Sequence, residues 1–305
     1  MAGSITWTLQ PPDRFDNPAA AEYDFAARRS WSWFELVAAN QVPIKMTHSQ
    51  ADGTHQWDLN AERWHSLFGE NDPNRRDLLD PIILRLLGNP AGMRVLDAGC
   101  GDGYLCRKLA KLGAQMTGVE CSARMLSFAL ESEKADLLAI TYFRSDIASL
   151  SFMADATFDA IVTNNVIQDT ANYLEAFDGF KRIVKLGGKY IHIVNHPCFS
   201  TPTFGWVKDA DGNKLYRKVD RYFDRGSITM PWGPKSGMES TIFWHRTLSD
   251  QMNALISRGF RIDEVIEPEP PRSWYRDHPE RLDAARIPDF LVLSCTREDR
   301  PGVSG

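Results

Sequence analysis

The chain has 305 residues, of which 43% are hydrophobic and 25% charged, and its formal net charge at pH 7 is −5. This length suits one large domain, or one domain with an elaboration, and the hydrophobic content can cover both faces of a sheet. The acidic balance without a long basic run argues against a nucleic-acid partner, and the lack of a bilayer-length apolar run argues against a membrane partner.

The five cysteines limit the chemistry further. They are odd in number and contain no Cys-x-x-Cys pair, which favours reduced, buried thiols over a disulfide framework or a zinc site. Residues 1–15 lack the charged start and apolar stretch of a secretory signal. We therefore predict a cytoplasmic protein with no metal site.

The first 75 residues are expected to form an N-terminal lead-in and a helical cap. Aromatic and alanine residues at helical spacing predict a helix over residues 19–37. This helix either packs on the main domain or caps a ligand cleft, and the sequence does not choose between the two. A linker is expected over residues 41–55, with a turn at Asp52-Gly53, and then a short helix over residues 58–68.

Residues 76–199 alternate between apolar runs and helical periodicity, which is typical of a parallel, doubly wound sheet. A helix over residues 74–87 is predicted to lead into this core. Strands are predicted over residues 93–97, 115–119, 139–143, 158–163 and 190–194, and the helices between them over residues 104–112, 122–134 and 172–185. The last helix is expected to end at Gly187-Gly188.

A glycine-rich turn follows the first predicted strand, in the sequence Asp97-Ala98-Gly99-Cys100-Gly101-Asp102-Gly103. Glycines at every second position leave no Cβ between the backbone and a ligand above the turn. The helix that begins after the turn adds unpaired N–H groups and the positive end of its dipole. The turn therefore predicts a site where a polar or anionic group lies against bare backbone.

The next three strands also end in polar residues. Glu120 stands about twenty residues past the glycine turn, a position from which a carboxylate binds ribose hydroxyls. Asp146 beside Ile147 suits an adenine, because the carboxylate can accept an exocyclic amine proton while the isoleucine flanks the ring. The fourth strand ends in Asn164-Asn165. Open α/β sheets bind their ligands at such strand ends.

Together these residues resemble the signature set of class I S-adenosylmethionine-dependent methyltransferases, over residues 58–295. The resemblance implies S-adenosylmethionine as the cofactor and an α/β, Rossmann-like, doubly wound seven-stranded sheet whose last strand is antiparallel. The rival dinucleotide-binding pattern, G-x-G-x-x-G, would need its third glycine at Tyr104, whereas it stands at Gly103. The residues predicted to bind the cofactor are Arg75, Asp97, Gly99, Cys100, Gly101, Glu120, Cys121, Met125, Asp146, Ile147 and Asn164.

Within this set, the resemblance places Gly99 and Gly101 against the methionine part of the cofactor and Asp97 near its ammonium group. Two assignments have alternatives. Arg75 either reaches the methionine carboxylate or is a solvated arginine at a helix start. Met125 either touches the adenine or packs in the core.

Residues 200–246 form a segment too long for a plain connector. A hairpin is predicted with arms over residues 204–208 and 214–219, and a further strand over residues 240–245. The many aromatic residues of this segment predict an inserted, β-rich substrate lid with flat walls. The alternative is a structural flap with a small apolar core of its own.

Residues 247–305 are expected to complete the core. The sequence Thr247-Leu248-Ser249-Asp250 resembles a capping box and predicts the start of a helix that ends before Gly259. The last two strands are predicted over residues 260–265 and 290–296, joined by a proline-rich loop.

Methyl transfer requires an aligned acceptor and exclusion of water, and it requires a base only where the acceptor loses a proton. His196, after the fifth strand, is either that base or a hydrogen-bonding hinge residue. His245 is the second candidate, with anchoring of the backbone as its alternative, and Tyr222 is a candidate to polarise the acceptor. The residues predicted to line the acceptor side are Asn165, Gln168, Asp169, Trp206, Trp232 and Trp244.

The His-Pro-Cys-Phe sequence at 196–199, with Arg-x-x-x-x-Gly-Gly before it, resembles a bacterial subgroup of small-molecule, natural-product methyltransferases. We therefore predict methyl transfer from S-adenosylmethionine to oxygen, nitrogen or carbon of a small, indole- or phenol-like metabolite. One alternative is a protein of the same fold that uses S-adenosylmethionine in another reaction, such as a rearrangement. The other is an interaction module with a vestigial cleft. The sequence is also compatible with a homodimer.

Overall fold

The computed structural model describes residues 48–70, 72–232, 236–277 and 285–299. These residues belong to one unit, Ile44–Gly305. The helix predicted over residues 19–37 lies outside the described residues. Within the described ranges, no helix combines the length and the hydrophobicity that a membrane span would need.

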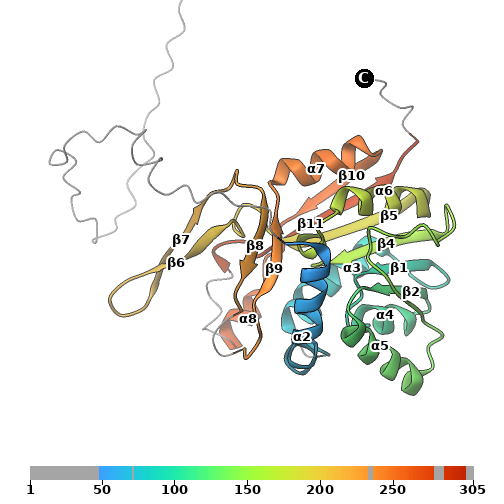
Figure 1. The fold of residues 1–305 in the computed structure, drawn as a ribbon, viewed down its shortest axis with the longest axis horizontal. Helices are drawn as coiled ribbons and strands as arrows, with labels where there is room; N and C mark the ends of the chain where they lie inside the picture. The colour runs from blue at the N-terminus through green and yellow to red at the C-terminus, as the bar shows by residue number, and fades with distance from the viewer. Residues whose placement is uncertain (1–47, 71, 233–235, 278–284, 300–305) are drawn as a thin grey trace, which may run out of the picture. The chain divides into compact units, whose positions relative to one another are not determined.

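A seven-stranded sheet forms the centre of the unit, with the strand order β10-β11-β5-β4-β1-β2-β3 (Figure 1). The strands are β1 (Arg94–Ala98), β2 (Gln115–Glu120), β3 (Thr141–Arg144), β4 (Phe158–Asn164), β5 (Val184–Asn195), β10 (Phe260–Ile266) and β11 (Phe290–Arg297). β1 to β5 pair in parallel, and β11 runs antiparallel to both β5 and β10. The predicted sheet, with its antiparallel last strand, is confirmed.

Helices cover both faces of this sheet (Figure 1). α3 (Asp80–Leu87) and α4 (Tyr104–Ala110) pack on one face, and α6 (Tyr173–Ile183) and α7 (Leu248–Ser257) pack on the other. α5 (Ala123–Asp136) follows β2. Apolar residues of the parallel strands alternate between the two cores: Leu96 of β1 belongs to the α6–α7 side and Val95 to the α3–α4 side.

The strand order reverses between β1 and β4, because the chain moves outward from β1 to β3 and then returns to β4 on the other side of β1. At such a reversal the connections leave in opposite directions, so a crevice opens at the carboxyl ends of the two strands. The glycine turn after β1 and the asparagines after β4 therefore face the same crevice.

The turn predicted at Asp52-Gly53 is wrong, because both residues lie in the first turn of α2 (Gln50–Phe68). Ser49 and Asp52 form a capping box: the Ser49 hydroxyl accepts from the Asp52 amide, and the Asp52 carboxylate accepts from the Ser49 amide. A Cβ at Gly53 would stand 3.0 Å from the Trp244 ring. The glycine therefore allows a close helix contact and does not mark a turn.

The helix stop predicted at Gly187-Gly188 is also wrong. α6 ends at Ile183, and β5 begins at the next residue and includes both glycines. The β4–β5 register shifts between Phe158 and Ala160, opposite this part of β5. Gly187 has a φ of 74°, and a Cβ at Gly188 would lie 2.8 Å from the Lys185 carbonyl oxygen, so the glycines accommodate an irregular strand.

The inserted segment contains two separate antiparallel pairs. β6 (Thr203–Lys208) pairs with β7 (Lys214–Asp220), which confirms the predicted hairpin. β8 (Gly226–Met230) pairs with β9 (Thr241–His245); β9 was predicted, whereas β8 was not. Figure 1 shows the β6–β7 hairpin projecting away from the seven-stranded sheet and β9 lying between β8 and α2.

The remaining elements are short. η1 (Asn74–Leu79) is a π-helical turn that leads into α3, η2 (Ile167–Asp169) is a 3-10 turn after β4, and α8 (Arg272–Asp277) precedes β11. Thr247 and Asp250 form the predicted capping box of α7.

Candidate functional site

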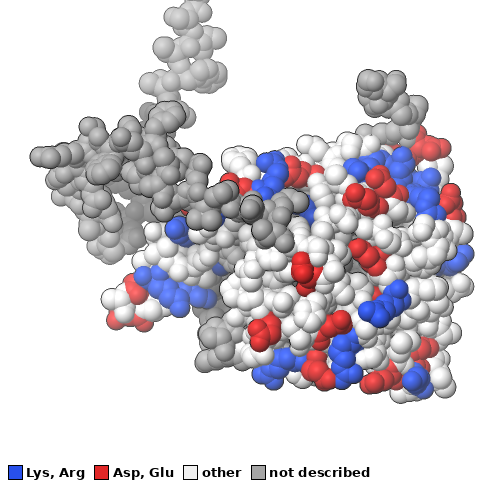
Figure 2. Space-filling view, in the orientation of Figure 1, with Lys and Arg blue, Asp and Glu red and all other residues white. Residues whose placement is uncertain are grey.

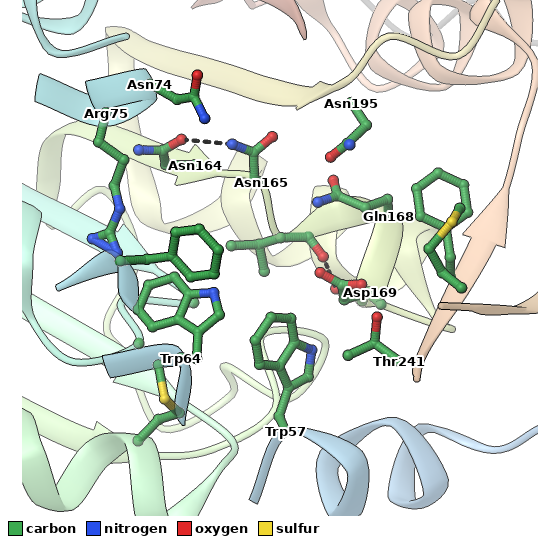
Figure 3. A pocket seen from close by; sticks show the side chains of 18 of the residues that line it. Trp57, Trp64, Asn74, Arg75, Asn164, Asn165, Gln168, Asp169, Asn195 and Thr241 are labelled. Atoms are coloured by element: carbon green, nitrogen blue, oxygen red, sulfur yellow. Dashed lines mark hydrogen bonds between the residues drawn. The ribbon is translucent and has the colours of Figure 1, made fainter. Parts of the chain in front are cut away.

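A cavity of about 460 Å³ opens at the carboxyl ends of β1, β2 and β4. α2, η1, and parts of β6 to β9 complete its walls. All eleven residues predicted to bind the cofactor line this cavity, although they come from eight different elements and turns. Figure 3 shows Arg75 and Asn164 at one end, and Gln168, Asp169 and Thr241 at the other.

The glycine turn is held by its neighbour strand. The amides of Gly99 and Cys100 both donate to the Val119 carbonyl, at 2.7 and 2.9 Å, which ties the turn after β1 to β2. Gly99 has a φ of 83°, and a Cβ there would stand 2.4 Å from the Val166 side chain. Only glycine fits this position, because both the backbone angle and the contact exclude a side chain.

Gly101 has a φ of 57°, and a Cβ there would meet only the Met125 methyl group, at 3.2 Å. Met125 itself lines the cavity. The space above Gly101 therefore belongs to the cavity, and a ligand there would contact the backbone directly. This observation fits the predicted placement of the cofactor's methionine part.

Glu120 lies at the end of β2 and is only 8% exposed. One carboxylate oxygen accepts from the Gly101 amide at 3.0 Å and the other from the Ser122 amide at 2.8 Å. Burial raises the pKa of Glu120, and these two amides offset part of that increase. The Cys121 thiol also donates to Oε1, at 3.5 Å, whereas Oε2 keeps a second lone pair that can accept from a ribose hydroxyl.

Arg75, from η1, presents an unpaired donor to the cavity. Its guanidinium lies between the rings of Trp64 and Tyr104, with Cζ 4.5 and 4.8 Å from their centroids. Nη1 lies 3.8 Å from Asp102, whereas Nη2 is buried and has no hydrogen-bond partner. A buried guanidinium N–H without a partner fits a ligand carboxylate, which favours the first alternative for Arg75.

Asp97, at the end of β1, is 2% exposed. Burial raises its pKa to about 7, although the Cys106 thiol, which donates to Oδ2 at 3.4 Å, and the Arg75 charge oppose the shift. A cationic group nearby would stabilise the ionised form of this carboxylate, which fits the predicted neighbour, the cofactor's ammonium. The donor set around the cavity is therefore compatible with S-adenosylmethionine.

Asp146 and Ile147 follow β3 and also line the cavity. The Ala148 amide donates to Asp146 Oδ1 at 2.9 Å, and this bond fixes the carboxylate while its other oxygen stays available. Ile147 is 5% exposed and belongs to the core below. The pair stands where the adenine is predicted to lie.

An aromatic wall lines the rest of the cavity and begins at Trp64, which also packs on Arg75. Trp57, Trp64 and Phe68 come from α2 and Trp232 from the segment after β8, and their rings form contacts with centroids 5.8–6.3 Å apart. These rings, with the loop that carries Asn165 to Thr170, define what we call the acceptor half of the cavity. Of the residues predicted for this half, Asn165, Gln168, Asp169 and Trp232 line it.

Trp206 and Trp244 were also predicted for the acceptor side, but neither lines the cavity. Trp206 lies on the β6–β7 hairpin, with the Arg286 guanidinium 4.8 Å from its ring centroid. Trp244 is 4% exposed and packs against Gly53 of α2. Both are packing residues in this structure.

The structure does not bring the three predicted catalytic residues to the cavity. His196 Nε2 donates to Glu267 at 2.8 Å, and its Nδ1 accepts from the Cys198 amide. His245 Nε2 donates to the Tyr222 carbonyl at 2.8 Å, while the Tyr222 hydroxyl accepts from the Leu248 amide at 2.9 Å. These bonds anchor the loop after β5 and the ends of the inserted segment, as the structural alternatives for the histidines proposed.

Sequence reasoning missed the aromatic wall of α2. The spacing of Trp57, Trp64 and Phe68, seven and then four residues apart, was a readable signal for one helix face. It could not show that this face covers a ligand cavity. That placement depends on α2 docking through Asp58, whose carboxylate accepts from the Ser122 hydroxyl and the Arg124 amide at the start of α5.

The charge distribution adds little to the site itself. On the face shown in Figure 2, acidic and basic side chains alternate without an extended basic patch. Among the residues that the structure describes, no group of three or more His, Cys, Asp or Glu side chains is arranged to hold a metal ion.

Comparisons with known proteins agree with this geometry. Residues 96–192 match a family described as a methyltransferase domain. A solved structure from Listeria monocytogenes, assigned as an S-adenosylmethionine dependent methyltransferase, is 30% identical, with 72% of this chain and 96% of that one covered and a TM-score of 0.63. One from Mesorhizobium loti is 28% identical, with 71% and 96% covered and the same TM-score.

The curated relatives match over shorter stretches. A ubiquinone biosynthesis O-methyltransferase from Xanthomonas axonopodis pv. citri (strain 306) is 27% identical over 47% of this chain and 62% of its own length. The chain thus spans about three fifths of that relative and 52–57% of two further enzymes of the same name.

Proposed function

Because the chain belongs to the class I S-adenosylmethionine-dependent methyltransferases, we propose that it transfers a methyl group to oxygen, nitrogen or carbon of a small aromatic metabolite. Its cofactor, S-adenosylmethionine, supplies an electrophilic methyl group on a positively charged sulfur. The acceptor class is inferred from the indole and phenyl rings of the acceptor half.

One observation carries the proposal: a single cavity joins the fixed polar groups of the strand ends to an aromatic chamber. The glycine turn, Glu120 and Asp146 would hold the cofactor in one orientation. Trp57 and Trp232 would hold a flat acceptor beside it and exclude water. Alignment of this kind is the main contribution that a protein makes to a direct displacement.

The first experiment tests the cofactor half by calorimetry with S-adenosylhomocysteine. Gly101→Val should abolish binding, because the new side chain would enter the cavity at a φ of 57°, which valine rarely adopts. Gly205→Val is the matched control: Gly205 lies in β6, and a Cβ there meets nothing within 4 Å. Circular dichroism would show that both variants fold. Unchanged affinity in Gly101→Val would contradict the assignment of the turn.

The second experiment tests the reaction itself. Labelled S-adenosylmethionine is incubated with the protein and extracts of the source organism, and the labelled product is identified by mass spectrometry. A methylated small aromatic molecule is the expected result. Cofactor binding without any methylated product would instead support another reaction on the same fold.

A further inference from the structure

The loop after β4 is held rigidly at the edge of the acceptor half. Arg246 donates from Nη1 to the Ile167 carbonyl at 2.8 Å and from Nη2 to the Thr170 and Ala171 carbonyls. Its guanidinium also lies 4.1 Å from the centroid of the Tyr173 ring. The side chains that this loop carries are therefore presented to the cavity in fixed positions.

Three hydrogen-bond acceptors of this loop have no donor. Asn165 Oδ1 and Gln168 Oε1 are buried without a partner, and Gln168 is only 8% exposed. The Asn165 amide is oriented by its Nδ2, which donates to Asn164 at 3.3 Å. Asp169 is partly buried, and among the described residues nothing donates to its carboxylate; the charges of Glu120 and Arg246 act on it from a distance. Native proteins rarely leave buried amide oxygens such as those of Asn165 and Gln168 unsatisfied, so these atoms point to a ligand.

The backbone gives independent support. Asn165 has a φ of 59°, in the left-handed region, where non-glycine residues are uncommon. Its amide donates to the Ile193 carbonyl of β5 at 2.9 Å, which holds this conformation. Asparagine adopts this region more readily than most residues, and here the conformation places its side chain at the cavity.

The surroundings of Asp169 favour a cationic partner. Figure 3 shows Gln168, Asp169 and Thr241 on one side of the cavity, which the Trp57 ring also lines. The Glu120 charge repels that of Asp169, whereas the Arg246 charge attracts it, although the Arg246 N–H groups donate to backbone carbonyls. Burial raises the pKa of Asp169 well above its ordinary value. A positive group would relieve this cost, and aromatic faces also attract cations.

We propose that the methyl acceptor is an arylalkyl amine whose nitrogen is bound by Asp169, Asn165 and Gln168. This inference rests on the proposed function and adds the methylated atom to it. A primary ammonium carries a positive charge and three N–H donors, so it can bind the Asp169 carboxylate and still donate to amide oxygens of the same loop. A hydroxyl has no charge and a single donor, so it can satisfy only one of these groups.

The same arrangement gives Asp169 a part in the reaction. The ammonium gives one proton to the Asp169 carboxylate, so that the nitrogen lone pair becomes available. That lone pair forms the new N–C bond to the methyl carbon, while the electron pair of the breaking C–S bond stays on sulfur and neutralises it. The product leaves as a methylated ammonium, and Asp169 later returns its proton to water.

The test uses two probes that differ in one group: tryptamine, an amine, and tryptophol, the corresponding alcohol. Their affinities for the protein saturated with S-adenosylhomocysteine are measured by calorimetry. Tryptamine should bind at least about tenfold more tightly, and Asp169→Asn should reduce this ratio to about one, because the variant keeps the shape and loses the charge. Asp211→Asn, at the exposed tip of the β6–β7 hairpin, is the matched control and should retain the preference.

Binding of S-adenosylhomocysteine is measured first in all three proteins. Equal affinity in Asp169→Asn shows that the variant is folded and that the cofactor half is intact. The amine proposal is overturned by equal binding of the two probes, by binding of neither, or by a preference that survives in Asp169→Asn. Failure of S-adenosylhomocysteine to bind the unaltered protein would overturn the proposed function as well.

Discussion

The cofactor half and the acceptor half of the cavity differ in how their residues are brought together. Apart from Arg75, which comes from η1, the polar groups of the cofactor half lie at the ends of β1 to β4 or in the turns that follow them, so they have their places once the parallel sheet forms. The acceptor half combines α2, the loop after β4 and the segment after β8, which only tertiary packing brings together. The first half is therefore local in origin and the second is not.

This difference suggests that the two halves respond separately to mutation. A substitution of Arg246 tests this most directly, because Arg246 holds the loop after β4 and lies outside the cavity lining. Burial lowers the pKa of Arg246 to about 10, so the side chain stays charged at neutral pH.

Arg246→Met should lower the free energy of unfolding by about 2 kcal/mol, because two buried carbonyl groups and a partly buried one lose this donor. Urea denaturation measures this change. Arg225→Met is the control: Arg225 forms an exposed ion pair with Asp250, and pairs of this kind contribute at most about 1 kcal/mol. If the affinity for S-adenosylhomocysteine fell as much in Arg246→Met as the affinity for an acceptor, the two halves would not be separable.

The sequence predicted the cofactor half because its residues follow strands at fixed offsets. Glu120 could be placed relative to Gly101 from the β1–turn–β2 pattern, and the structure puts their atoms in hydrogen-bond contact. Trp57 gives no such signal, since nothing near it in the sequence indicates that α2 docks on α5. The Asp52-Gly53 turn failed for the same reason: the contact that requires a glycine comes from Trp244, almost two hundred residues away.

The three residues predicted to be catalytic lie outside the cavity lining for a similar reason. The sequence pattern places a histidine at a strand end close to the site, but the orientation of its side chain depends on tertiary contacts. Glu267 turns the His196 ring away from the cavity lining, and the Tyr222 carbonyl engages His245. Asp169 was placed on the acceptor side, but its unpaired carboxylate could be recognised only once its surroundings were known.

A second prediction concerns the cofactor half and the pH dependence of its affinity for S-adenosylhomocysteine. Asp97 has a pKa of about 7, raised by burial, so a large fraction is protonated below neutral pH. If its carboxylate meets the ligand's ammonium, ionisation favours binding. Affinity for S-adenosylhomocysteine should then be full above pH 7 and fall as the pH falls through 7, by about tenfold for each further unit.

Calorimetry at pH 5.5 to 8.5, a range of about three units around the pKa, measures this dependence. Asp97→Asn should bind weakly and show a flatter profile, because the titrating group is gone. An unaltered protein whose affinity is constant across the range would contradict the contact between Asp97 and the ammonium. The acceptor half should be insensitive to Asp97→Asn once the cofactor half is saturated.

The smallest expected effect concerns His196, and it tests whether the distinction between the halves extends to catalysis. Removal of a general base lowers turnover by about 100-fold or more. His196 is 3% exposed, bonds to Glu267 and the Cys198 amide, and does not line the cavity. His196→Ala should therefore change the rate of methyl transfer by no more than about threefold, measured with the acceptor found in the labelled-methyl assay.

The His196→Ala substitution should instead lower the free energy of unfolding by about 1 kcal/mol, because the variant loses the hydrogen bond to Glu267 and leaves the Cys198 amide unpaired. A hundredfold loss of turnover with unchanged stability would instead identify His196, in the loop after β5, as the general base. It would also mean that this loop moves when the ligands bind, since in the present arrangement the imidazole does not line the cavity.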